Sequence, residues 1–183
     1  RRRHRSRLVG WRCRPAVPAG AGHAVAGVVV VAAYRAAARE PAAAAWRIVA
    51  PNPSPLTGPG TNTYVVGTDR AVVIDPGCDD RAHLERVLEV AGGAVERIVC
   101  THSHPDHSLG AAWLRERTGA PVCGLSAPDD GYQDPSYAPD AGIAEGECIA
   151  AGDSLLRAIH TPGHASNHVC LMLEESGLLF TGD

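Results

Sequence analysis

Beyond residue 60 the chain contains short apolar runs of the length typical of strands, each bounded by glycine, proline or polar residues. The expected strands are 62–66, 71–75, 96–100, 121–124, 154–160, 168–173 and 178–183. The first two are separated only by the turn sequence GTDR, so they predict a hairpin. The proline- and glycine-rich stretch PNPSPLTGPG (51–60) before them cannot be helical.

Two other segments have the three-to-four-residue apolar spacing of amphipathic helices. The first follows Asp79 and Asp80, either of which can cap it, and it ends before Gly92. The second begins at Pro105, a residue suited to the first turn of a helix, and ends at Gly119. Because strands and helices alternate before a final run of strands, the sequence predicts a mixed α/β sheet with helices outside.

Charge divides the chain of 183 residues into two parts. Residues 1–47 contain ten arginines and one acid, whereas 48–183 contain seven arginines and nineteen acids. We expect 1–45 to be an Arg/Ala-rich N-terminal extension, with an export signal as the alternative, and 46–183 to be the folded domain. The apolar run 24–33 is too short to cross a bilayer, so no membrane partner is expected. The acidic domain argues against a general nucleic-acid-binding surface.

Composition excludes several kinds of enzyme. All seventeen basic residues are arginine, so a Walker-type phosphate loop, a Schiff-base lysine and a Ser-x-x-Lys acyl-enzyme are ruled out. The six cysteines form no CxxC motif, and Cys100, Cys123 and Cys170 lie in apolar runs, where buried free thiols rather than disulfides are expected. A reducing, cytoplasmic setting fits this pattern.

The stretch THSHPDH (101–107) crowds four ligand-type side chains into one loop, namely His102, His104, Asp106 and His107. Crowded imidazoles repel or desolvate one another unless they share a cation. His102 and His104 lie two residues apart in an extended loop and can turn toward one ion, whereas Asp106 and His107 lie in the first helical turn and point elsewhere. Two adjacent ions therefore suit the cluster better than one.

Two further ligand-type residues follow other expected strands: His164, after 154–160, and Asp183, at the end of 178–183. Ligands in such sheets bind beyond the carboxyl ends of strands, so these segments are expected to meet at one edge of one sheet. Asp183 can bridge two ions through its two oxygens. Imidazole and carboxylate ligands without thiolate suit Zn²⁺, one or two ions, with Fe or Mn as alternatives. The alternative, a surface His-rich loop with fortuitous metal affinity, would explain neither His164 nor Asp183.

These motifs resemble those of the metallo-β-lactamase superfamily. THSHPDH matches its HxHxDH signature, TPGH (161–164) and TGD (181–183) match its next ligand segments, and IDPG (74–77) resembles its early aspartate motif. NPSPLTGPGTNTYVVG (52–67) is similar to the start of the β-lactamase-like 2 and glyoxalase II-like branch. The resemblance implies an αββα sandwich with an incomplete second half. It also implies one metal on His102, His104 and His164, a second on Asp106 and His107, and a bridging Asp183.

The resemblance further implies a hydrolase in which a metal-bound hydroxide attacks an acyl or thioester substrate, while Asp106 orients the nucleophile or handles its proton. Three alternatives stay open: an RNA phosphodiesterase of the same fold, an iron persulfide dioxygenase, and a non-catalytic metal-binding fragment. A further histidine that the family supplies to the second metal is absent from the sequence, so we expect either a fragment or a truncated form with a weaker second site. The oligomeric state is left undefined.

The remaining candidates are assigned to supporting roles. Asp75 is expected to orient the histidine loop through its carboxylate rather than to bind metal. His160 is expected to pack or to support a ligand, and His168 to be structural rather than to line the rim. The other histidines are expected to be solvated: His4, His23 and His83. The polar loop 126–142 is the expected substrate-facing segment.

Overall fold

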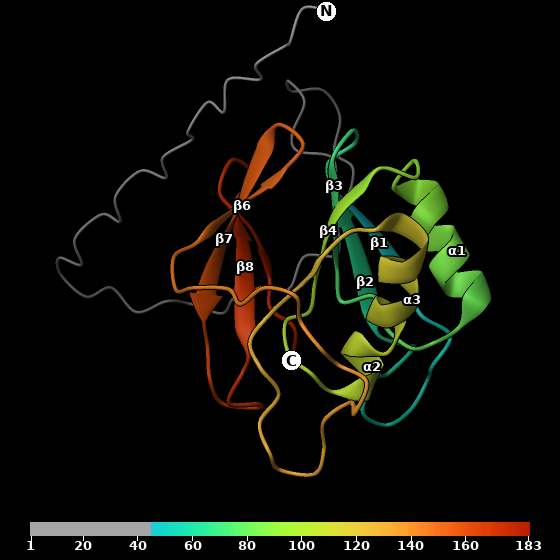
Figure 1. The fold of residues 1–183 in the computed structure, drawn as a ribbon, viewed down its shortest axis with the longest axis vertical. Coiled ribbons are helices and arrows are strands. Elements are labelled where there is room, and N and C mark those ends of the chain that lie inside the picture. The colour runs from blue at the N-terminus through green and yellow to red at the C-terminus, as the bar shows by residue number, and fades with distance from the viewer. Residues whose placement is uncertain (1–44) are drawn as a thin grey trace, which may run out of the picture.

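A computed structural model describes residues 45–183, so the expectations for the N-terminal extension, its export-signal alternative, His4 and His23 lie outside the described residues. Two sheets form the framework (Figure 1). The first has the order β1-β2-β3-β4-β5 and consists of β1 (Ala45–Val49), β2 (Asn62–Val66), β3 (Ala71–Ile74), β4 (Val95–Val99) and β5 (Val122–Cys123). The second has the order β6-β7-β8-β9 and consists of β6 (Cys148–Ala151), β7 (Ser154–His160), β8 (Val169–Leu173) and β9 (Leu178–Phe180).

Strand direction differs between the two sheets. In the first, β1, β2 and β3 pair antiparallel, as the expected hairpin requires, and β3, β4 and β5 pair parallel. The parallel pairs are connected through α1 (Arg81–Val90), and through α2 (Pro105–Ser108) with α3 (Gly110–Thr118). The second sheet is antiparallel throughout, not mixed, because short turns join its strands.

Side chains of β3 alternate between two apolar layers, which explains why the whole strand is buried. Val72 and Ile74 pack between the sheets, against residues such as Leu156 and Leu171. Ala71 and Val73 point to the opposite layer, which the helices cover. Figure 1 shows α1 and α3 on the side of the first sheet that faces away from the second. This arrangement matches the α/β sandwich expected, with helices described on one side only.

Both helical segments begin where the sequence predicts. The Asp80 side chain accepts a hydrogen bond from the His83 backbone N–H at 2.8 Å and so caps α1. The second segment is split into α2 and α3, which the sequence does not predict. The Gly110 N–H donates to the Gly77 carbonyl at 2.9 Å, and a Cβ on Gly110 would lie 3.0 Å from the Pro76 oxygen. The helix is therefore interrupted because its backbone docks on the turn after β3.

Several expectations need correction. Strands β1 and β6 were not predicted, and β9 ends at Phe180, three residues before the expected end. Cys100, Cys123 and Cys170 are free thiols, as expected. Among the described residues, no helix is long and apolar enough to span a bilayer.

Candidate metal centre

The ligand-type residues lie together at one edge of the sandwich, but they come from two sheets rather than the single sheet expected. The histidine loop follows β4 in the first sheet, whereas His164 follows β7 and Asp183 follows β9 in the second. Strands β7 and β9 are each antiparallel to β8, so their carboxyl ends lie at the same edge. The Val169 N–H donates to the Thr101 carbonyl at 2.8 Å and joins the two sheets at this edge.

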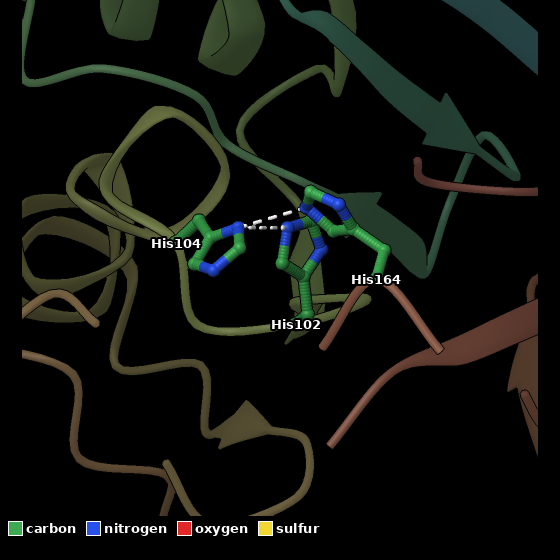
Figure 2. Close-up of side chains that lie close together, drawn as sticks. All are labelled: His102, His104 and His164. Atoms are coloured by element: carbon green, nitrogen blue, oxygen red, sulfur yellow. Dashed lines mark hydrogen bonds between the residues drawn. The ribbon is translucent and has the colours of Figure 1, made fainter. Parts of the chain in front are cut away.

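Three imidazoles form the first group of donors (Figure 2). The Nδ1 atom of His104 lies 3.0 Å from Nε2 of His102 and 2.9 Å from Nε2 of His164. His102 is buried and His164 is exposed, so the group opens to solvent on one side. This is the set of residues that the sequence assigned to the first metal.

His107 and Asp183 are central to the second group. The Nε2 atom of His107 lies 3.2 Å from Oδ1 of Asp183 and 3.6 Å from Oδ2 of Asp106. The other oxygen of Asp183, Oδ2, lies 3.5 Å from Nε2 of His164 in the first group. Asp183 thus faces both groups with one oxygen each, as a bridging ligand would.

Asp75 fixes the orientation of this edge, as the sequence predicts. Its carboxylate accepts hydrogen bonds from the Thr101 N–H at 2.7 Å, the Thr101 hydroxyl at 2.9 Å and Nδ1 of His107 at 2.9 Å. The Thr101 hydroxyl proton is used in this way, so the contact of 3.1 Å between Thr101 Oγ1 and His102 Nδ1 requires Nδ1 of His102 to donate. Both histidines are therefore held with Nε2 toward the other ligand-type groups.

Electrostatics at the centre favours a bound cation. Burial and the neighbouring imidazoles lower the pKa of His102 to about 2, so its ring is neutral. Burial opposes protonation of His107, but Asp75 and Asp183 raise its pKa to about 10. The hydrogen bond from His107 lowers the pKa of Asp183 to about 2. His107 and Asp183 thus form an ion pair in the absence of metal, and metal binding at these groups would release the proton of His107.

The donor set fits a metal ion on its own chemistry. Three imidazole nitrogens face one another in the first group, and a single Nδ1 proton on His104 can satisfy only one of its two neighbours. The ligand atoms of His102, His104 and His164 lie within 4.8 Å of one another, and so do those of His102, His107 and Asp183. Nitrogen and carboxylate donors suit Zn²⁺, Fe or Mn, and they do not distinguish among these metals.

Other histidines do not all lie where the sequence placed them. His83 is buried rather than solvated, and its Nε2 lies 3.0 Å from Thr63 Oγ1 and 3.2 Å from the Pro76 carbonyl. Burial lowers its pKa below the usual 6.5. His160 is exposed rather than packed, and its Nε2 lies 3.3 Å from the Ser166 carbonyl. Neither side chain belongs to the donor set.

The loop 126–142 is attached to the histidine loop by hydrogen bonds that the sequence does not reveal. Asp134 is buried, and its Oδ2 accepts a hydrogen bond from Ser108 at 2.8 Å, while its N–H donates to the Ser103 carbonyl at 2.8 Å. Buried Asn167 donates to Ser103 Oγ at 2.8 Å. Such contacts join distant segments, so no local pattern marks them in the sequence.

A cavity of about 130 Å³ adjoins the second group of donors. Asp106, His107 and Asp183 border it, so the cavity leads to the carboxylates and the imidazole. The lining also includes Tyr64 and Phe180, whose ring centroids lie 4.8 Å apart. The cavity therefore offers an aromatic wall as well as the polar donors.

The fold and the donor set together define an α/β sandwich with a candidate metal centre at one edge. The model of the metallo-beta-lactamase superfamily matches residues 56–183, and the chain belongs to this superfamily. It is 36% identical over 141 residues to the thioesterase pkgB of Emericella nidulans, and the match covers 75% of this chain and 39% of that protein. It is 35% identical over 147 residues to an atrochrysone carboxyl ACP thioesterase of Passalora fulva, covering 75% and 41%.

Solved structures support the fold. A metallo-beta-lactamase from Cronobacter sakazakii aligns with a TM-score of 0.59 and 23% identity, over 74% of this chain and 58% of that chain. The matched region spans about two fifths of the two thioesterases. Neither relative is named as a glyoxalase II, so these matches support the superfamily and not the glyoxalase II-like branch expected from the sequence.

Proposed function

We propose that the protein is a metal-dependent hydrolase of acyl thioesters. One observation carries the proposal: imidazoles and carboxylates from two sheets converge with Nε2 of His102 and of His107 held toward the cluster. In this reading His102, His104 and His164 would hold one ion, Asp106 and His107 would hold a second, and Asp183 would be shared between them. The two thioesterase relatives support the same substrate class.

The residues bordering the cavity favour a thioester over an amide or a phosphodiester. An amine leaving group needs a proton donor, whereas a thiol with a pKa of about 8.5 leaves as a thiolate without one. The cavity lining contains no arginine among the described residues, so no guanidinium there would bind phosphates. The excess of acids in 48–183 also disfavours RNA.

When bound, the metal would supply an activated water and polarise the acyl carbonyl. The chain's own groups position the reaction around it. Asp106 borders the cavity with a side chain that is 32% exposed, and it is placed to accept the proton of the attacking water. The apolar wall near Tyr64 and Phe180 would hold the acyl group.

The test is hydrolysis of an acyl-pantetheine thioester and of a glutathione thioester by the zinc-loaded protein, with single-stranded RNA assayed in parallel. We expect metal-dependent thioester hydrolysis that Asp106→Asn reduces by a factor of about 100 or more. Asp79→Asn, a change of the same kind at an exposed acid, is the matched control. A preference for the glutathione thioester would support the glyoxalase II-like branch.

Other outcomes separate the alternatives. RNA cleavage that is faster than thioester hydrolysis and lost in Asp106→Asn would contradict the proposal in favour of a phosphodiesterase. Oxygen consumption with a glutathione persulfide by the iron-loaded protein would indicate a dioxygenase. Bound metal without turnover of any of these substrates would indicate a metal-binding fragment.

A further inference from the structure

His168 is a buried histidine beside the metal centre that the ligand set does not use. It lies just before β8, and its ring centroid is 5.2 Å from that of His102. Its Nε2 lies 3.3 Å from the backbone nitrogen of Asp183, and its Nδ1 lies 2.8 Å from Thr161 Oγ1. The ring therefore contacts both loops of the second sheet that carry ligand-type residues.

The positions of the protons follow from these contacts. A backbone N–H can only donate, so Nε2 of His168 must accept from Asp183 and carry no proton. Nδ1 therefore carries the proton and donates to Thr161 Oγ1. The Thr161 hydroxyl is then free to donate to Cys170 Sγ at 3.3 Å, and the Cys170 thiol donates to the Thr181 carbonyl at 3.5 Å.

Both ends of this chain of hydrogen bonds lie in the same short turn. It begins at the N–H of Asp183 and ends at the carbonyl of Thr181, on either side of Gly182. Gly182 has a φ of 60°, and a Cβ there would lie 2.5 Å from Nε2 of His168. The imidazole thus packs so closely on the turn that only glycine fits between them.

We propose that His168 is a positioning residue that sets the bridging carboxylate of Asp183 through its backbone, and that Thr161 selects the required tautomer. The inference rests on the proposed metal-dependent function, since it concerns the position of a ligand. If Thr161 did not accept the Nδ1 proton, the ring could place N–H against the N–H of Asp183, and the turn would move.

Two matched pairs of variants test the proposal in the full chain, with Zn²⁺ titrated against a competing chelator. His168→Gln keeps an acceptor near the Nε2 position, whereas His168→Asn cannot reach Asp183. We expect His168→Asn to weaken zinc binding by about 10- to 100-fold and His168→Gln to stay close to the parent. Thr161→Val should reproduce the loss and Thr161→Ser should not, because only serine retains the hydroxyl.

If the proposal holds, the effect of His168 on zinc binding must also depend on Asp183. In an Asp183→Ala background, His168→Asn should weaken zinc binding no further, because the carboxylate it positions is gone. Nitrogen NMR of the metal-free parent should show His168 protonated on Nδ1. Equal zinc affinity in His168→Asn and His168→Gln, an additive loss in the double variant, or a proton on Nε2 would each overturn the proposal. A parent that binds no zinc would instead contradict the proposed function, because the NMR result does not depend on metal.

Discussion

Replacing Asp75 by asparagine should disable the centre without removing a ligand. The buried carboxylate accepts three hydrogen bonds, from two groups of Thr101 and from His107. In Asp75→Asn the oxygen must stay with the Thr101 N–H, so the new amide N–H₂ faces the Thr101 hydroxyl and Nδ1 of His107. Thr101 then donates to Nδ1 of His102, whose proton moves to Nε2, while His107 loses its Nδ1 proton and keeps the one on Nε2. Two nitrogens that should bind metal would carry hydrogen instead.

The magnitude follows from these contacts. Hydrogen bonds to a charged group contribute about 1.5–3 kcal/mol each, and two are lost or inverted, so the metal-free protein should lose about 3–6 kcal/mol of unfolding free energy. Zinc affinity should fall by about 100-fold. Backbone strain is not the cause, because asparagine tolerates the φ of 50° at this position. Urea unfolding with chelator present and competitive zinc titration measure the two effects, with exposed Asp79→Asn as control. Zinc affinity within threefold of the parent would refute the tautomer argument.

Three further predictions follow from other sites. His104→Ala should remove most of the rise in melting temperature that zinc produces, measured by thermal unfolding with and without chelator. In the metal-free protein, the lowered pKa of buried His83 stabilises the fold fully above about pH 6.5 and progressively less below it. Urea unfolding between pH 7 and pH 5 should therefore show a smaller loss of stability in His83→Gln than in the parent. Gly182→Ala should cost about 1–3 kcal/mol because its Cβ would meet His168, whereas Gly163→Ala, with no atom within 4 Å of its Cβ, should change unfolding free energy by less than about 0.5 kcal/mol.

The sequence predicts most elements of the fold because their signals are local. Alternation, a hairpin turn and the Asp80 cap depend only on neighbouring residues, and these elements form as expected. Strand β1 was missed because three of its five side chains are exposed, so it carries no clear apolar run. The break before Gly110 was missed because a distant backbone, that of Gly77, causes it.

The convergence of the ligand-type residues was also predictable, since each follows a strand and the motif spacing is distinctive. The assignment of ligands to individual ions stays a prediction. The sequence did not reveal that the ligand-type residues come from two sheets, because strand order depends on long-range pairing. The contacts of His168 and His83 were likewise hidden, since a single histidine in a sequence gives no sign of what its two nitrogens contact.

The division of the donors between two sheets has a consequence for folding kinetics. His104 and His164 are 60 residues apart in sequence, and they meet only after both sheets have formed and docked. A cation that needs both sheets is therefore expected to bind late in folding, once these long-range contacts have formed. Bound metal would slow unfolding far more than it speeds folding. It would therefore increase the lifetime of the folded state without guiding the chain to it.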